Sequence, residues 1–441
     1  MIALRGRLAD LTLAERALLL DRRPADEPEV RARVAELLAL VRARGDDALL
    51  EMARRYDKVD LAAIEVPRAR WENALVSLDG SVRSALERAA KNIAAFHAAQ
   101  MPVELTVDVE PGVRLGRRFG PLGAVGVYAP GGRASYPSSV LMGAVPARVA
   151  GVAEVIVCSP PGPDGTPPPA VLAAAALAGA TRVFALGGAG AVGAMAYGTA
   201  TVPRCDAVVG PGNRWVLEAK RQVAGEVRID SPAGPSELLV LADGSADPDL
   251  IAAELIAQAE HDPDAAVALV TTEPALLDAV ASALGKRLAG APRREVIAAA
   301  LATRGALLVA DSLAEAVQFT EFYAPEHLLV LTRNAAVDAE RIHTAGTIFL
   351  GPGSAVAFGD YMTGGNHVLP TAGSGRSFSG LSALDFLRSW TWQEVSPAGA
   401  RALSEDTAVL ADAEGLPGHA AAARLRADMP GAGGGALVEG R

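Results

Sequence analysis

The sequence contains few cysteines, few histidines and few aromatic residues. Aromatic residues make up 4% of the 441 positions, and the two cysteines are Cys158 and Cys205. Neither cysteine has a partner at metal-ligand spacing. One disulfide between them is possible, but we expect both thiols to be reduced and buried in an intracellular protein. The six histidines are few enough to weigh one at a time.

The chain also lacks an excess of positive charge and a long apolar run. Its 41 basic and 51 acidic residues give a net charge of −10, which argues against a nucleic-acid partner. Charged residues interrupt the N-terminal stretch, so no signal peptide is expected. The most apolar region, 170–201, is rich in Ala and Gly and contains Arg182, which favours a buried helix and strand over a membrane span. The composition is typical of a cytoplasmic enzyme for small molecules.

The length predicts two or more domains, and the patterning predicts their class. Apolar residues recur at three- and four-residue intervals over 28–53 and 81–99, which predicts helices. Two later sets of apolar strands alternate with helices, as in parallel βαβ units. The predicted strands lie at 122–130, 153–160, 181–187, 237–243, 265–272, 306–310 and 328–332. The predicted fold is therefore α/β, with two doubly wound Rossmann-like domains, a helical N-terminal segment and a helical C-terminal arm.

Four parts follow from this pattern. Residues 1–27 form the helical N-terminal segment, and 28–120 join 237–381 in a discontinuous first α/β domain. Residues 121–236 form the second α/β domain. From 382 to 441 the chain is predicted to be a helical arm that ends in a disordered glycine-rich tail.

Gln258 and His261 occupy the end of a predicted helix over 249–260. Asp247 and Pro248 suit its start, and Pro263 stops it. An amide oxygen and an imidazole three residues apart share one helix face and form half of a metal site. Taken alone, such a pair is more often a surface polar pair.

Glu326 and His327 lie in a turn between a predicted helix and a predicted strand. Ser312 and Glu315 can form a capping box at the start of that helix, and Pro325 ends it. An adjacent carboxylate and imidazole could serve two separate proton transfers. Taken alone, the dipeptide is better explained by a solvated turn.

Residues 351–380 combine many glycines with Asp360, Asn366 and His367. Such a stretch loses much conformational entropy and buries little apolar surface, so a ligand-binding role is favoured over a flexible loop. His419, five residues after Glu414, precedes a capped surface helix. His97 and His343 have amphipathic helical surroundings and are interpreted as structural or surface residues.

Gly188, Gly190 and Gly193 form a literal GxGxxG after the strand at 181–187, with Asp206 near the spacing of a ribose-binding acid. The surrounding sequence is rich in Ala and Gly, and the following helix is short. The motif is therefore weak evidence for a dinucleotide site.

Together, these segments resemble the histidinol dehydrogenase family over nearly the whole chain and in the same order. The matching stretches are residues 125–152, 210–240, 257–263, 323–328, 345–371 and 414–426. They include GPGN and SPAGPSELLV (both within 210–240), AQAEHDP (257–263), YAPEHL (323–328), GDYMTGGNH (within 345–371) and EGLPGH (within 414–426). The family is a zinc- and NAD-dependent oxidoreductase that converts histidinol to histidine at the end of histidine biosynthesis.

The resemblance implies a role for each matching position. The zinc ligands would be Gln258, His261, Asp360 and His419, which also touch the substrate. His327 would be the general base of the first oxidation and would also contact substrate, and Glu326 would activate water before the second. Further substrate contacts would be Ser236, His367 and Glu414; NAD contacts would be Tyr128, Asn213 and position 190.

Gly190 departs from the family pattern, which has Gln there. The resemblance implies that one polar NAD contact is lost and that cofactor binding weakens modestly. It also implies a homodimer in which Glu414 and His419 complete the partner's site.

Three other functions remain open: a related zinc dehydrogenase for another small alcohol, a metal-dependent hydrolase and an inactive binding protein. The presence of Glu414 and His419 favours histidinol over another alcohol. The retained pair Glu326 and His327 argues against a pure binding protein.

Overall fold

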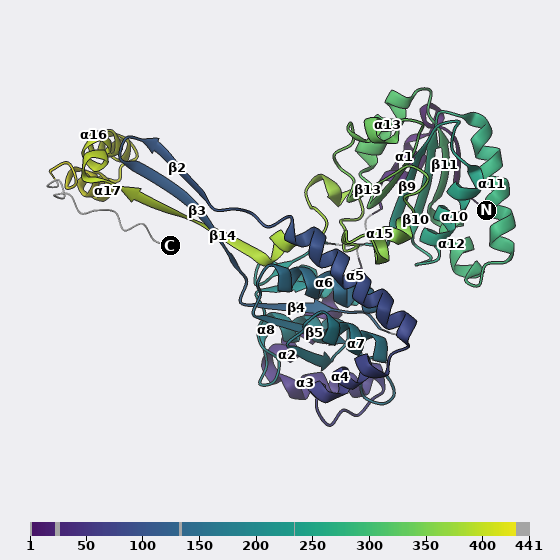
Figure 1. Ribbon diagram of the computed structural model, residues 1–441, viewed down its shortest axis with the longest axis horizontal. Coiled ribbons are helices and arrows are strands. Elements are labelled where there is room, and N and C mark those ends of the chain that lie inside the picture. The colour runs from purple at the N-terminus through teal and green to yellow at the C-terminus, as the bar shows by residue number, and fades with distance from the viewer. Residues whose placement is uncertain (1, 23–26, 132–134, 233, 429–441) are drawn as a thin grey trace. The chain divides into compact units, whose positions relative to one another are not determined.

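The computed structural model describes residues 2–22, 27–131, 135–232 and 234–428. They fall into two units, residues 1–100 with 122–386 and residues 101–121 with 387–441 (Figure 1). The glycine-rich end of the chain, 429–441, lies outside the described residues, as does the prediction of a disordered tail.

Unit 1 contains a six-stranded, all-parallel sheet. Its strand order is β1 (Leu4–Arg7), β11 (Gly305–Val309), β10 (Ala266–Thr271), β9 (Glu237–Ala242), β12 (His327–Leu331) and β13 (Thr347–Leu350). Successive residues of a strand face opposite sides, so Leu238 and Val240 belong to one apolar core and Leu239 and Leu241 to another. The first core includes helices α10 (Pro248–Ala259), α11 (Pro274–Ala289) and α12 (Arg294–Arg304). The second includes α1 (Leu13–Leu20), α13 (Leu313–Tyr323) and α14 (Ala335–Ala339).

A second parallel sheet in unit 1 has five strands. Its order is β6 (Arg182–Ala185), β5 (Glu154–Ser159), β4 (Ala124–Tyr128), β7 (Ala207–Val209) and β8 (Arg228–Ile229). Gly126 meets Met195 of α8 (Gly188–Tyr197), whereas Val127 meets Gly143 of α6 (Pro137–Val149). Because adjacent strand residues face opposite sides, α6 and α8 cover opposite faces. Helix α7 (Pro169–Leu177) packs with α6, and α9 (Arg214–Val223) packs with α8.

The N-terminal helices pack differently from the predicted grouping of 28–120 with 237–381. Helices α2 (Pro28–Arg44) and α3 (Asp46–Met52) pack on α8, while α4 (Arg68–Ser77) and α5 (Gly80–Ala98) pack on α7 and α6. Their apolar periodicity showed which helix faces are buried but not which layer they cover. A break at Gly45 (φ 53°) divides the helix predicted over 28–53.

Unit 2 consists of a three-stranded antiparallel sheet and two helices that pack on each other. Its strands run in the order β14 (Leu387–Val395), β3 (Val113–Pro121) and β2 (Leu105–Glu110). The helices are α16 (Pro397–Ala413) and α17 (Pro417–Arg424), at one end of the sheet in Figure 1. The prediction of helix from Ser382 onward was wrong for β14, because its pairing with β3 is a long-range contact.

The α/β class and all seven predicted strands are confirmed. The N-terminal segment is not wholly helical, because β1 pairs with β11 at the edge of the six-stranded sheet. Cys158 and Cys205 are buried free thiols, as expected. No helix within the described ranges combines the length and apolar character needed to cross a membrane.

Candidate active site

Glu326 and His327 sit at the amino edge of the six-stranded sheet, where α13 passes into β12. The helix ends at Tyr323, Ala324 adopts a left-handed conformation (φ 51°, ψ 67°), and His327 is the first residue of the strand. Ser312 caps α13 by accepting a hydrogen bond from the Glu315 N–H. The predicted capping box forms only in part, because Glu315 Oε2 accepts from the Asp311 N–H at 2.6 Å. Both site residues are buried, with 5% and 4% of their surface exposed, so the turn is not a solvated one.

The backbone of Glu237 holds the side chains of both Glu326 and His327. Its N–H donates to Glu326 Oε2 at 2.6 Å, and its carbonyl oxygen lies 2.9 Å from His327 Nδ1. Because a carbonyl can only accept, Nδ1 carries a proton, so Nε2 is the nitrogen that gains or loses the second proton of the ring. Nε2 is buried without a hydrogen-bond partner among the described residues and lies 3.5 Å from Asp360 Oδ1.

The buried groups shift one another's proton affinity. Burial raises the pKa of Glu326. Burial alone would lower the pKa of His327, but the carboxylates of Glu326 and Asp360 outweigh it and raise that pKa well above its ordinary value. Burial opposes ionisation of Asp360, yet His327 holds the pKa of Asp360 below its usual value. The site thus favours an ionised Asp360 beside a strongly basic imidazole.

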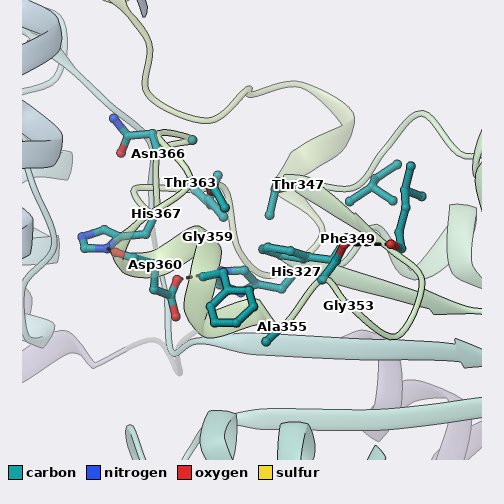
Figure 2. A pocket seen from close by; sticks show the side chains of 16 residues that line it. His327, Thr347, Phe349, Gly353, Ala355, Gly359, Asp360, Thr363, Asn366 and His367 are labelled. Atoms are coloured by element: carbon teal, nitrogen blue, oxygen red, sulfur yellow. Dashed lines mark hydrogen bonds and ion pairs between the residues drawn. The ribbon is translucent and has the colours of Figure 1, made fainter. Parts of the chain in front are cut away.

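A pocket of ≈ 360 Å³ opens beside this pair (Figure 2). Asp360 from α15 (Val356–Tyr361) lies directly beside His327 in its lining, and His367 follows on the next loop. His367 Nδ1 donates to the Asp360 carbonyl at 2.9 Å, which leaves its Nε2 free as well. Thr347 and Phe349 complete one wall, and neither was singled out from the sequence.

The loop that carries Asp360, Asn366 and His367 needs its glycine for packing. Gly364 has φ 99°, and a Cβ there would lie 2.5 Å from the Asn92 carbonyl oxygen of α5. The sequence favoured a ligand-binding role for this glycine-rich stretch. At Gly364 the close approach is to the chain's own backbone, while Asn366 and His367 do line the pocket.

Gln258 and His261 lie together at the end of α10, also at the amino edge of the sheet. Asp247 caps this helix, Gln258 belongs to its last turn, and His261 follows the C-cap residue. Gln258 Nε2 is 3.4 Å from His261 Nδ1. Although His261 is an exposed residue, the atoms around its ring desolvate it and lower its pKa, against the attraction of Asp360.

These donors fit a metal ion chemically. A neutral imidazole, an ionised carboxylate and an amide oxygen are borderline ligands of the kind that zinc accepts. The C-terminal ends of α10 and α13 meet this edge, and the partial negative charge of helix C-termini favours a cation. Within the described ranges, no three His, Cys, Asp or Glu side chains are grouped to hold a metal by themselves. In the ligand set that the family resemblance implies, His261 and Asp360 of unit 1 are joined by the amide oxygen of Gln258.

Tyr128, Asn213 and Gly190 belong to the other sheet. Tyr128 ends β4, and its buried hydroxyl accepts a hydrogen bond from the Gly188 N–H at 3.1 Å. Asn213 caps α9 through Oδ1, which accepts from the N–H groups of Trp215 and Val216. Both positions follow strand carboxyl ends and lie beside helix N-termini, where anionic phosphates bind readily.

Gly190 is buried inside α8 rather than open to a ligand. A Cβ at this position would lie 2.9 Å from Met52 Sδ and 3.5 Å from Leu49 Cδ2. Helix α3 therefore occupies the space into which a Gln side chain at position 190 would extend.

The acid spaced after the glycine motif serves a structural purpose. Asp206 precedes β7, and its Oδ2 accepts hydrogen bonds from the Gly123 and Ala124 N–H groups at 2.8 and 3.2 Å. It thus lies at the amino end of the strand, the opposite edge from the start of α8. This supports the interpretation of the GxGxxG spacing as weak evidence.

The remaining site residues predicted from the sequence are Ser236, Glu414 and His419. Ser236 directly precedes Glu237 of β9, next to the turn that holds Glu326 and His327. Glu414 and His419 are exposed residues of unit 2, at the end of α16 and on α17.

Glu237 was missed. Its signal in the sequence is a charged residue at the head of an otherwise apolar strand, ELLVLA. The periodicity of that strand showed a buried element but gave no partner for the charge.

Two doubly wound parallel sheets, with a polar pocket at the edge of one of them, define an α/β enzyme. The sequence matches the histidinol dehydrogenase family over residues 20–427. A histidinol dehydrogenase of Methanosarcina mazei is 47% identical, with 97% of this chain and 98% of that protein covered. One from Haloarcula marismortui is 49% identical over 95% and 98%. The crystal structure of the Elizabethkingia anophelis enzyme superposes with a TM-score of 0.91 at 34% identity, covering 96% of this chain and 98% of that one.

The chain belongs to the histidinol dehydrogenase family. It is accordingly a dehydrogenase, an oxidoreductase of histidine biosynthesis.

Proposed function

We propose that this chain oxidises L-histidinol to L-histidine through histidinaldehyde, with two NAD⁺ consumed and one zinc ion bound per subunit. The observation that carries the proposal is the buried Glu326–His327 pair beside a pocket lined by Asp360 and His367, in a chain of this family. Two proton acceptors with different surroundings suit two successive oxidations.

Gln258, His261 and Asp360 would hold the zinc ion, together with His419 of the partner subunit. When bound, zinc supplies a fixed point that orients the amino alcohol so that its reacting carbon faces the nicotinamide. The same residues then contact the substrate as well as the metal.

His327 removes the hydroxyl proton of histidinol in the first oxidation. Its Nδ1–H is committed to the Glu237 carbonyl, so the proton goes to Nε2, which has no hydrogen-bond partner among the described residues and lies 3.5 Å from Asp360 Oδ1. Loss of this proton lets the C–H bond release its hydride to NAD⁺, which leaves the aldehyde and NADH.

Glu326 takes a proton from water as the water attacks the aldehyde carbon. Its Oε2 is held by the Glu237 N–H, and its burial raises its pKa, which makes the carboxylate a stronger base. The resulting hydrate gives up a second hydride, so one water and two NAD⁺ are consumed for each histidine formed.

Tyr128 and Asn213 would contact the cofactor at the carboxyl edge of the five-stranded sheet. Asn213 uses Oδ1 for the helix cap, so its Nδ2 is the group available to a ligand among its described contacts. Gly190 offers no side chain, and its surroundings are filled by Met52 and Leu49.

Ser236, His367 and Glu414 would complete substrate recognition, Glu414 from the partner subunit of a homodimer. The exposed positions of Glu414 and His419 on unit 2 are compatible with this role. We also propose that the enzyme works in the cytoplasm, where two buried thiols such as Cys158 and Cys205 stay reduced.

The test is histidine formation by the purified protein from histidinol and NAD⁺. We expect chelation to abolish the activity and added zinc to restore it, whereas His261→Asn should bind less zinc and not be restored. Turnover of histidinol without NAD⁺, or full activity after the metal is removed, would refute the proposal.

A further inference from the structure

A buried ion pair lies behind the Glu326–His327 turn and is used by none of the steps above. Arg22 and Glu237 are 5% and 1% exposed, and the guanidinium meets the carboxylate at 2.8 Å through Nε and 3.2 Å through Nη2. Arg22 lies on the segment after α1, 215 residues before Glu237 in the sequence. The guanidinium also stacks on the Tyr323 ring, 3.5 Å from its centre.

Burying two charges is costly and rarely the cheapest way to stabilise a fold. This pair has further hydrogen-bond partners, since Nη2 of Arg22 also donates to the carbonyl oxygens of Tyr323 and Ala324 at 2.7 and 3.3 Å. Glu237 Oε1 accepts a further hydrogen bond from the Ala372 N–H at 2.8 Å. The pair therefore connects four separate segments, namely the segment after α1, the start of β9, the turn after α13 and the loop after His367.

Two of its partners have a strained backbone. Ala324 and Ala372 have φ values of 51° and 55°, in a region that residues with a Cβ rarely occupy. Lys58 is the other non-glycine residue with positive φ in the part of the chain that the structure describes. Such conformations persist only where surrounding contacts enforce them. Arg22 bonds the carbonyl of Ala324, and Glu237 bonds the N–H of Ala372.

The same Glu237 supplies the peptide groups that orient the two proposed bases. Its N–H fixes Glu326, and its carbonyl selects the His327 tautomer. Arg22 holds the side chain of Glu237, and the backbone of Glu237 holds the two bases. Glu237 thus couples the ion pair to the site.

We propose that Arg22 and Glu237 are positioning residues, which hold the Glu326–His327 turn in its working geometry by clamping the strained backbone at Ala324, before the turn, and at Ala372, in the loop after His367. The inference rests on the proposed function of that pair. Neither residue lines the pocket beside His327, so their loss should lower kcat for both oxidations and leave the KM for histidinol and the zinc content near those of the wild type.

Arg22→Lys keeps the charge but loses the forked contact, and we expect kcat to fall by about 10- to 100-fold. Arg304→Gln is the matched control. Arg304 also anchors the N-terminal segment, through hydrogen bonds to the carbonyls of Leu18 and Asp21 rather than to Glu237, so the kcat of this variant should stay within about twofold of wild type.

A second variant separates positioning from stability. The double change Arg22→Met with Glu237→Leu removes both charges, and such replacements of a buried pair are often neutral or stabilising. We expect its melting temperature to stay near that of the wild type, while kcat with histidinol and with histidinaldehyde remains depressed.

Wild-type kcat in either Arg22→Lys or the folded double variant would overturn the inference. A fall in kcat that Arg304→Gln reproduces would also overturn it, because the effect would then come from the N-terminal segment as a whole. An inactive wild type would instead refute the proposed function, so the two failures are distinguishable.

Discussion

The Glu326 carboxyl group and the His327 imidazole share one backbone support but differ in their neighbours. Glu326 is bonded to the Glu237 N–H, whereas His327 directs its free nitrogen toward Asp360. The carboxylates make the imidazole more basic than usual. At the residue scale, this difference separates the two proposed proton transfers.

Glu326→Gln should stop the reaction at the aldehyde, with histidine formation lowered by about 10²- to 10⁴-fold. The first NADH should still appear. Since the Glu326 carboxylate raises the pKa of His327, its removal should lower that pKa and shift the rising limb of the first step to lower pH. Stopped-flow absorbance across the pH range measures both effects.

The matched control is Glu340→Gln, an exposed carboxylate of the same unit. It should leave the rate and the pH profile unchanged. A Glu326→Gln enzyme that forms histidine at the normal rate would exclude this carboxylate as the base for water.

Asp57 gives a stability prediction of the opposite sign to that of most carboxylates. Burial raises its pKa from 3.8 to about 6. The folded state therefore binds this proton more tightly than the unfolded state does. The stability contributed by the protonated Asp57 carboxyl is fully present below pH 3.8 and is lost as pH rises through about 6. The difference in unfolding free energy between Asp57→Asn and wild type should therefore rise by about 1–2 kcal/mol from pH 4 to pH 7, in favour of the variant, after allowance for partial solvent screening. Urea unfolding at both pH values measures this, and an equal difference at both would contradict it.

At the element scale, patterning predicted what depends on local sequence. The seven strands and the caps of α10 and α13 follow from apolar runs and from Asp247 and Ser312. The sequence did not predict the other strands of the described residues, namely β1, β2, β3, β7, β8, β13 and β14. Strands β1 and β14 illustrate the reason, because each is defined by a distant partner, β11 and β3. For the site, the sequence supplied Gln258 with His261 as a pair, but not Glu237, whose role is set by contacts with segments far along the chain.

Asn213 combines a helix cap with a proposed cofactor contact, and two variants separate them. Asn213→Asp keeps the capping oxygen but loses the Nδ2 donor, so α9 should remain stable while NADH binding weakens. Asn213→Ala should weaken binding and also cost about 1 kcal/mol in unfolding free energy. Fluorescence titration with NADH and denaturant unfolding measure the two effects. Wild-type NADH affinity in Asn213→Asp would remove Asn213 from the cofactor site.

Gly190→Gln tests the packing of α8 on α3. The new side chain meets Met52 and Leu49, so we expect a loss of about 1–3 kcal/mol through overpacking. Adding Met52→Ala makes room and should recover part of that loss. Urea unfolding of the single and double variants measures it, and a single variant more stable than wild type would show that this contact gives way easily.

At the scale of the whole molecule, the two sheets present chemically different edges. Helix C-termini meet the amino edge of the six-stranded sheet near His261, which suits a cation. Helix N-termini meet the carboxyl edge of the five-stranded sheet near Tyr128 and Asn213, which suits phosphates. Periodicity predicted both sheets but could not predict which edge carries which residues, because that depends on the strand order.

The proposed sharing of sites between subunits predicts recovery of activity on mixing. His261→Asn and His419→Asn homodimers should each be nearly inactive. After unfolding and refolding together, half of the dimers are mixed, and each mixed dimer has one intact site of two, which gives about a quarter of wild-type activity. No recovery, with mixed dimers shown by differently tagged subunits, would contradict the shared site.

The most direct measurement of the central claim is the number of NADH molecules formed per histidine. Zinc-loaded protein is mixed with limiting histidinol and excess NAD⁺, and NADH absorbance is compared with histidine separated by chromatography. The account predicts two NADH for each histidine. One NADH with the aldehyde as the final product, or none at all, would contradict a four-electron oxidation at this site.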